Sequence, residues 1–119
     1  MSAPTFGRII WAKIPDQRGL AHEPHPAVII TPTDDIDPAG TVWVVGVSTK
    51  HHLASEEFRT PLQFDPTGRC RTKLRRASWA VSNWLAEVDL SSIEAEHYAG
   101  VVPEIVMQEI VRKIPGIGA

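Results

Sequence analysis

Apolar residues in this chain gather in short runs, separated by polar segments rich in proline, glycine and aspartate. Residues 8–14 are β-branched and aromatic and stop at Pro15, so they predict a first strand. Residues 27–31 are almost continuously apolar, which is typical of a strand buried on both faces. Residues 41–49 carry the clearest strand pattern of the sequence, whereas the polar segment 16–26 is predicted to be a loop.

The second half of the chain indicates further strands and leaves two segments open. Residues 58–64 fit a short strand, and Pro61 favours an edge position because proline cannot donate a ladder hydrogen bond. Residues 78–89 fit either one long strand or a bent pair of strands. Ser91-Ser92-Ile93-Glu94 has the capping-box pattern and predicts a helical turn that starts there. Residues 95–102 fit a continued helix as well as a short strand before Pro103.

An amphipathic helix is predicted at the end of the chain, over residues 103–114. Pro103 suits the first helical position, and Arg112 suits the negative C-terminal end of the helix dipole. Apolar residues recur at a spacing of four, and the resulting stripe is expected to pack against the sheet. The stripe consists of Val106, Ile110 and Ile114.

Short strands, irregular loops and one helix together predict a mainly β fold: a small, strongly bent sheet or barrel with a C-terminal α-helix. The strands do not alternate with helices, which argues against a parallel βαβ fold. The 119 residues fit a single domain spanning 1–119. A domain of this size buries only about two-thirds of the surface of its unfolded chain, so oligomerisation is expected to stabilise it.

Sequence features bearing on the compartment favour the cytoplasm. No apolar run approaches the roughly 20 residues needed to span a bilayer, and the N-terminal residues lack the pattern of a secretory signal. Cys70 is the only cysteine, so an internal disulfide is impossible. We therefore expect no membrane association and a cytoplasmic protein.

Charge is unevenly distributed along the chain, although the net charge is only −2. Five of the 12 basic residues fall within eight positions that contain no acidic residue. Such a polarised surface can hold a polyanion despite the mildly acidic total, and the alternative is a solvated loop. The run consists of Arg69, Arg71, Lys73, Arg75 and Arg76.

Strong signatures of nucleotide or hydride chemistry are absent, since the sequence has no P-loop, dinucleotide fingerprint or nucleophile elbow. His22 and His25 share one predicted loop, and His51 and His52 share another. No cysteine or aspartate at fixed spacing supports a zinc site formed by these pairs, so neither a metal nor a cofactor is expected. Histidine is also the natural acid or base near neutral pH.

Hydroxyl and aromatic side chains supply further candidates. Ser48 and Thr49 end the strongest predicted strand, where a hydroxyl can meet a ligand or bond to the local backbone. The chain has four tryptophans, which usually serve packing. One exposed ring beside the basic run could stack on a base of single-stranded nucleic acid, and the sequence does not tell which. The candidates are Trp11, Trp43, Trp79 and Trp84.

Taken in order, these segments resemble the MazF/PemK family of toxin–antitoxin ribonucleases. The resemblance covers roughly residues 7–114, and the order of the segments is more persuasive than any one of them. The matching segments are Gly7-Arg8-Ile9-Ile10-Trp11 with Ile14-Pro15, His25 to Ile30, Val44 to Thr49, Leu74 to Val81, Val88-Asp89, Ile93, Gly100-Val101-Val102 and the final helix.

The resemblance implies an SH3-like barrel that forms a homodimer and cuts single-stranded RNA without a metal. In that family the 2′-hydroxyl of the RNA attacks the adjacent phosphate, assisted by a loop arginine and a strand-end threonine. The implied partners are single-stranded RNA and a cognate antitoxin whose tail occupies the RNA groove.

The sequence departs from the family pattern at the arginine, which is replaced by His25. Thr49 matches the family threonine, with Ser48 as a second hydroxyl. An imidazole suits proton transfer but lacks the permanent charge and the bidentate phosphate grip of a guanidinium. The resemblance therefore assigns His25 as acid or base, Thr49 as a hydrogen-bond donor to phosphate, and Arg75 or Arg76 as the source of positive charge.

Three functions follow from these residues. The first is a toxin-like, metal-independent endoribonuclease that acts on single-stranded RNA. The second is a catalytically inactive barrel that binds RNA or a protein partner, which the replacement at His25 favours. The third is a small-ligand or structural module that shares only the barrel, because fold does not fix function.

Overall fold

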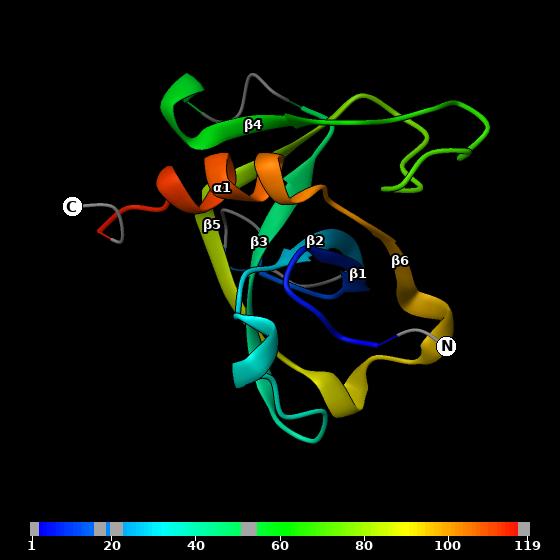
Figure 1. The fold of residues 1–119 in the computed structure, drawn as a ribbon, viewed down its shortest axis with the longest axis vertical. Coiled ribbons are helices and arrows are strands. Elements are labelled where there is room, and N and C mark those ends of the chain that lie inside the picture. Colours follow the sequence, from blue (N-terminus) through cyan, green and yellow to red (C-terminus); the bar gives the residue numbers. More distant parts are fainter. Residues whose placement is uncertain (1–2, 16–18, 20–22, 51–54, 117–119) are drawn as a thin grey trace.

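The computed structural model of the chain describes residues 3–15, 19, 23–50 and 55–116. The described residues form one antiparallel sheet of six strands in the order β4-β5-β3-β2-β1-β6. The sheet curls into a half-barrel, and one α-helix, α1, lies against one side of it (Figure 1). The elements are β1 (Arg8–Ala12), β2 (His25–Ile29), β3 (Thr41–Ser48), β4 (Arg59–Leu62), β5 (Ser78–Asp89), β6 (Tyr98–Val101), α1 (Glu104–Arg112) and the short 3-10 turns η1 (Thr33–Asp35), η3 (Glu56–Phe58), η4 (Leu90–Ser92) and η5 (Ala95–His97).

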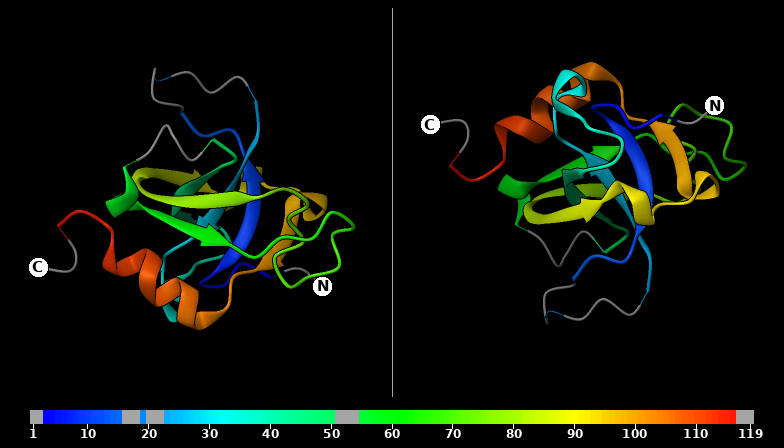
Figure 2. Two further views of the ribbon diagram at one scale, coloured as in Figure 1. Left: turned by 90° about the horizontal axis from the view of Figure 1, so that it is seen from above. Right: turned by 90° about the horizontal axis from the view of Figure 1, so that it is seen from below.

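The central strands are buried on both faces because the sheet curls over them (Figure 2). In β2, Val28 belongs to a core cluster that also includes Met107 and Ile110 of α1. Its neighbours Ala27 and Ile29 belong to a second cluster on the opposite face. All three β2 residues are fully buried, which confirms the prediction from their continuous apolar run.

The strand ends differ from the predicted ones by one or two residues. β1 ends at Ala12 and β3 at Ser48, so Thr49 is the first residue after its strand. β2 begins at His25, which corrects the prediction that this residue lies in the loop 16–26. His25 is opposite Ala12 in the ladder of β1, so pairing with a neighbouring strand overrides the local turn signal of the flanking prolines.

The segment 78–89 forms one long strand, β5, rather than a pair. Its register against β3 shifts in the middle: Val45 is opposite Leu85, but the next residue, Gly46, is opposite Val81. Residues 82–84 therefore form a bulge, and bulges of this kind bend a strand. On its other side β5 pairs with β4, which is an edge strand, as predicted from its proline.

The structure of residues 89–101 differs from the prediction that a capping box starts a helical turn at Ser91. The turn η4 begins at Leu90, and the carboxylate of Asp89 accepts a hydrogen bond of 2.9 Å from the backbone N–H of Ser91. Ser91 therefore lies inside the turn and does not cap it, because an acidic side chain two residues earlier already accepts its N–H. The open segment that follows contains both structures: the turn η5 and then β6, which pairs with β1.

α1 begins at Glu104, and Pro103 is the extended residue before it, with φ −58° and ψ 147°. The prediction that Pro103 occupies the first helical position is thus wrong by one residue. The predicted stripe is confirmed as core: Ile110 and Ile114 are almost fully buried, and Val106 is half-buried against the cluster that includes Ile110. In the part of the chain that the structure describes, no helix is long and apolar enough to cross a bilayer.

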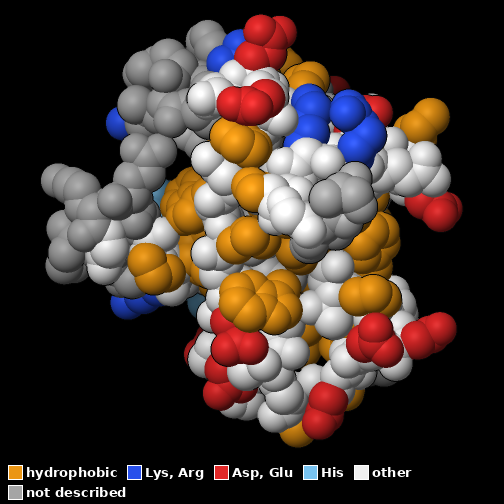
Figure 3. Space-filling model, turned by 90° about the vertical axis from the view of Figure 1, so that its left-hand side faces the viewer, with side chains coloured by type: hydrophobic (Ala, Val, Ile, Leu, Met, Phe, Trp, Pro, Cys, Tyr) orange, Lys and Arg blue, Asp and Glu red, His pale blue; other side chains and the backbone are white. Residues whose placement is uncertain are grey.

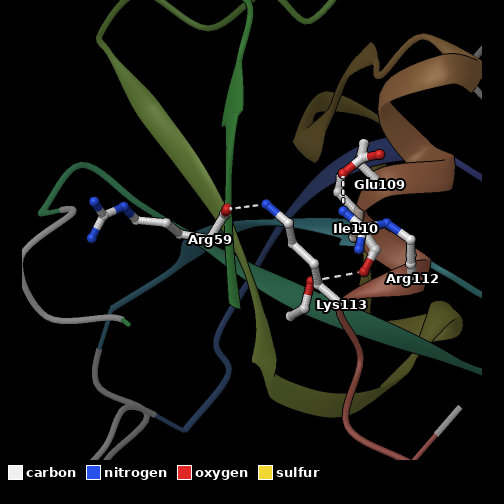
Figure 4. Close-up of polar contacts among 6 residues, drawn as sticks. Arg59, Glu109, Ile110, Arg112 and Lys113 are labelled. Carbon is white, nitrogen blue, oxygen red and sulfur yellow. Dashed lines mark hydrogen bonds and ion pairs between the residues drawn. The ribbon is translucent and has the colours of Figure 1, made fainter. Parts of the chain in front are cut away.

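Two polar contacts fix the end of α1 to the sheet (Figure 4). The ammonium group of Lys113 donates a hydrogen bond of 2.8 Å to the carbonyl oxygen of Arg59 on β4. The hydroxyl of Ser82, in the bulge of β5, donates one of 2.8 Å to the carbonyl oxygen of Ile110. Glu109 and Arg112 form an exposed ion pair on the outer side of the helix.

Candidate functional site

A groove of about 790 Å³ lies between the start of β2, the end of β3, the start of β5 and the segment 73–76. Every site residue predicted from the sequence lines it. These residues are His25, Ser48, Thr49, Arg75 and Arg76.

Strand pairing explains why His25 and Thr49 reach the same groove. β2 and β3 are antiparallel, with Ala27 opposite Gly46. The first residue of β2 therefore lies beside the last residue of β3, and the same register continued by two residues sets His25 level with Ser48. Thr49 follows immediately, so residues distant in the sequence meet at one rim.

The two hydroxyl residues at this rim have different surroundings. Ser48 is half-buried, and its Oγ accepts a hydrogen bond of 2.9 Å from the backbone N–H of Lys50. This bond closes the turn after β3, which is the local role usual for a hydroxyl at a strand end. Thr49 is exposed and lines the groove. Of the pair, Thr49 is the hydroxyl better placed to meet a ligand.

The basic run divides into two groups by the direction of its side chains. Alternate residues Thr72 and Leu74 are buried, so the basic residues between and after them are turned outward. Lys73, Arg75 and Arg76 line the groove, whereas Arg69 and Arg71 are exposed without lining it. Two members of the run are thus solvated, as the loop alternative predicts, and the other three line the groove.

Backbone contacts hold this basic segment against β6. The N–H of Val101 donates a hydrogen bond of 2.8 Å to the carbonyl of Arg71, and that of Gly100 donates one of 3.2 Å to the carbonyl of Thr72. A Cβ atom at Gly100 would lie 1.9 Å from the Arg71 carbonyl oxygen, so only glycine permits this approach. The segment is therefore a fixed wall of the groove rather than a free loop.

Asp65 lies next to this wall, and its backbone N–H donates a hydrogen bond of 2.9 Å to the carbonyl of Leu74. The hydroxyl and the backbone N–H of Thr67 donate to its carboxylate over 2.6 and 2.8 Å. These bonds lower the pKa of Asp65 below its ordinary value. The carboxylate is thereby occupied within its own turn.

Two tryptophan rings also line the groove, and they differ in how they are held. Trp11 is 41% exposed on β1. Trp84 is half-buried, and its indole N–H donates a hydrogen bond of 2.6 Å to the carbonyl of Pro15. The Trp84 ring also contacts the ring of His25, with 5.4 Å between centroids and 68° between planes. Trp11 is consequently the ring better placed to stack on a ligand.

Two lysines that the sequence analysis did not assign to the site, Lys50 and Lys73, also line the groove. Lys73 belongs to the basic run, but its left-handed backbone, with φ 61°, has no signal in the residue type. Lys50 directly follows the two strand-end hydroxyls. If the pairing of β2 with β3 had been inferred, Lys50 would have been placed at the same rim as His25. Four basic side chains and one acidic side chain, Glu23, line the groove among the described residues.

The predicted histidine pairs fall only partly within the structure. His25 is described, whereas His22, His51 and His52 lie outside the described residues. Within the described ranges, no group of three or more histidine, cysteine, aspartate and glutamate side chains gathers in a way that could hold a metal.

A second, smaller hollow lies away from the groove and is almost entirely apolar. Its lining includes Trp43 and Leu85, which are 51% and 40% exposed. Figure 3 looks onto the side of the molecule where β5 lies in Figure 1. Hydrophobic side chains gather in the middle of that face, and acidic side chains lie along its lower edge.

The structure is a curled, mainly β half-barrel with a C-terminal helix, and a cationic groove lies at the ends of its central strands. Its sequence matches, over residues 5–117, the family described as PemK-like, MazF-like toxin of type II toxin–antitoxin system. Because the match covers nearly the whole chain, the protein belongs to this toxin family. No curated protein matches the sequence.

Solved structures show the same fold at low sequence identity. A MazE–MazF structure from Deinococcus radiodurans has a TM-score of 0.66 at 15% identity, covering 96% of this chain and 93% of that one. An endoribonuclease from Mycobacterial species has a TM-score of 0.62 at 15% identity, covering 96% and 89%. An endoribonuclease in complex with its cognate antitoxin, also from Mycobacterial species, has a TM-score of 0.59 at 15% identity, covering 95% and 90%.

Proposed function

We propose that this protein is a toxin that cuts single-stranded RNA in the groove without a metal ion. The observation that carries the proposal is the convergence of His25, Thr49 and the basic wall on one groove. Membership of the toxin family and the fold shared with endoribonucleases support the same reaction. The cytoplasm is the compartment in which such a toxin meets its substrate.

In the proposed reaction the 2′-hydroxyl oxygen of one nucleotide attacks the adjacent phosphorus, and the bond from phosphorus to the 5′-oxygen of the next nucleotide breaks. His25 accepts the proton of the 2′-hydroxyl, and the departing 5′-oxygen takes a proton from water. The products are a 2′,3′-cyclic phosphate and a 5′-hydroxyl, and His25 returns its proton to solvent. The protein thus starts and ends the cycle in the same protonation state.

The transition state carries extra negative charge on the phosphate oxygens, which the groove is suited to stabilise. Thr49 donates a hydrogen bond to one of these oxygens. Arg75 and Arg76 supply the permanent charge that His25, in place of the family arginine, does not. One wall of the groove therefore carries the proton transfer, and the other carries the charge.

The groove also suits an extended single strand. Lys50 and Lys73 lie beside the two arginines and attract successive phosphates. Trp11 offers an exposed ring on which one base stacks, a contact that depends little on base identity. A duplex would hide the base faces that this contact requires.

Two protein partners complete the proposal. A cognate antitoxin covers the groove with an acidic segment, because the groove is predominantly basic.

A second copy of the chain covers the apolar hollow, since exposed tryptophan and leucine side chains such as Trp43 and Leu85 mark interaction sites when they cluster. Sedimentation across a range of concentrations tests the homodimer, and Trp43→Asp is expected to shift it to monomer.

The experiment that tests the proposed function is incubation of the purified protein with a mixed single-stranded RNA in EDTA. Cleavage is expected for the wild type and is expected to fall by at least about 100-fold in His25→Ala and in Thr49→Ala. Arg71→Ala is the matched control, since it removes a basic side chain of the same run outside the groove. Cleavage that survives in His25→Ala would remove the proposed base.

An inactive RNA-binding barrel is the second candidate, because His25 replaces the family arginine. It predicts salt-dependent RNA binding by the wild type with intact RNA at every pH. The same incubation distinguishes the two candidates.

A further inference from the structure

His25 can transfer a proton only if its ring is held at the groove. We infer that Trp84 is a positioning residue that fixes the orientation of the His25 imidazole. The inference rests on the proposed function for its meaning, but the ring contact can be tested without RNA.

The bulge in β5 directs Trp84 to the groove. The register shift between Val45 and Gly46 leaves residues 82–84 of β5 between paired positions. Ser82 is fully buried there and bonds to α1, whereas Trp84 lines the groove. Without the shift, strict alternation along β5 would give Ser82 and Trp84 the same side of the strand.

The indole ring of Trp84 lies directly on the backbone of Gly46. A Cβ atom at Gly46 would come within 2.1 Å of Cε3 and 2.2 Å of Cδ2 of this ring. No side chain fits between them, so any residue other than glycine would displace the ring. One face of the indole is therefore fixed by the backbone of β3.

A hydrogen bond fixes the remaining freedom of the ring. The indole N–H donates to the carbonyl oxygen of Pro15 over 2.6 Å. This bond joins β5 to the segment that follows β1 and prevents rotation of the indole within its plane. Trp84 is thus held by two elements before it meets His25.

His25 then packs against this fixed ring. The two rings meet edge to face, with 5.4 Å between centroids and 68° between planes, a preferred geometry for aromatic pairs. His25 is the first residue of β2, where a strand end alone leaves side-chain rotation free. The contact restricts that rotation, and a catalytic group misplaced by about 1 Å can lose about 100-fold in rate.

Two substitutions of Trp84 test this role. Trp84→Phe keeps an aromatic face against Gly46 but loses the N–H donor, and Trp84→Leu loses both. For Trp84→Leu we expect a fall in kcat of about 10- to 100-fold, with KM changed less than about threefold. Trp84→Phe is expected to have a kcat between those of the wild type and Trp84→Leu, because it keeps the contact with Gly46 and loses the bond to Pro15.

Phe6→Leu is the matched control for lost stability, because Phe6 packs against the core cluster that includes Met107 and does not line the groove. It is expected to lower thermal stability without lowering kcat at a temperature where the protein is folded. An equal fall in kcat for Phe6→Leu and Trp84→Leu would overturn the inference. So would an increase in KM at unchanged kcat, which would make Trp84 a base-stacking residue.

Proton NMR of the free protein separates this inference from the proposed function. The indole ring is expected to shift the carbon-bound ring protons of His25, and Trp84→Leu is expected to move both signals toward the positions of an unstacked histidine. That result supports the positioning role even if the wild type does not cut RNA. Unchanged His25 signals in a folded Trp84→Leu would overturn it, whatever the cleavage assay shows.

Discussion

The hydroxyl of Thr72 donates a hydrogen bond of 2.6 Å to the carbonyl oxygen of Gln63 and accepts one of 3.2 Å from the backbone N–H of Leu74. Thr72 is fully buried, so both bonds are shielded from water. They tie the basic segment to the residue that follows β4. Lys73 and Arg75, which line the groove, belong to the segment that these two bonds help to hold.

Replacing Thr72 by valine keeps the shape and removes the hydroxyl, which leaves the backbone groups of Gln63 and Leu74 without this partner. We expect a loss of about 1–3 kcal/mol in the free energy of unfolding, measured by urea denaturation. Thr60→Val is the matched control, because Thr60 is also buried and its hydroxyl has no hydrogen-bond partner among the described residues. The control is expected to be neutral or slightly stabilising. Equal losses in both variants would contradict the anchoring role of Thr72.

The salt dependence of RNA binding distinguishes the two groups of the basic run. Removing Arg75 or Arg76 is expected to weaken binding of a short single-stranded RNA and to reduce the slope of log K against log salt by about 0.7 for each phosphate that is no longer neutralised. Arg71→Ala, outside the groove, is expected to leave the slope unchanged. Fluorescence anisotropy at several salt concentrations gives the slopes. An equal change in Arg71→Ala would mean that the entire run binds RNA without regard to the groove.

The hydrogen bond between Ser82 and Ile110 links the bulge of β5 to α1. Ser82→Ala removes a buried donor and is expected to lower the free energy of unfolding by about 1 kcal/mol. Amide hydrogen exchange in α1 is expected to become faster, because this helix is then attached to the sheet at fewer points. Unchanged exchange in α1 would show that the apolar stripe and the bond from Lys113 to the Arg59 carbonyl hold the helix without the contribution of Ser82.

Acid is expected to destabilise the fold through Asp89. The hydroxyl and the backbone N–H of Ser91 donate to its carboxylate, and these bonds hold the pKa of Asp89 below its ordinary value of 3.8. Because the pKa is lower in the folded than in the unfolded state, the contribution to stability is present above 3.8 and is lost as pH falls through the folded value. Urea midpoints are therefore expected to fall between about pH 5 and about pH 2, and less so in Asp89→Asn. Parallel curves for the two proteins would contradict this assignment.

Local patterning was enough to predict β1 to β4 and the final helix, but it left open whether residues 78–89 form one strand or two and whether residues 95–102 are helix or strand. The apolar run of β2 is continuous because the curled sheet buries both faces of this strand. The apolar residues of α1 are spaced four apart because only one face of the helix packs against the sheet. The error at Ser91 arose because two hydrogen-bonding patterns compete locally, and the carboxylate of Asp89 accepts the N–H that the capping box would have used. The start of this turn thus differs from the predicted start by one residue, and local geometry rather than residue type decides between the two.

The candidate site was only partly predictable, because it is built by contacts between distant segments. His25, Thr49 and Arg75 were candidates from local patterns and from the family resemblance, and the pairing of β2 with β3 explains why His25 and Thr49 reach the same groove. The setting of Trp84 depends on a bulge opposite Gly46, and no local pattern predicts a register shift of that kind. For the same reason the sequence left open which tryptophans line the groove.

The most direct test of the proposed reaction is the behaviour of an RNA that lacks the attacking hydroxyl. After the cut site of the wild-type protein is mapped in EDTA, the same strand is made with a single 2′-deoxynucleotide on the 5′ side of that site. If the 2′-hydroxyl attacks and His25 takes its proton, the all-RNA strand yields a 2′,3′-cyclic phosphate and the substituted strand stays intact at that position. Cleavage of the substituted strand at the same site and rate would contradict the proposed mechanism.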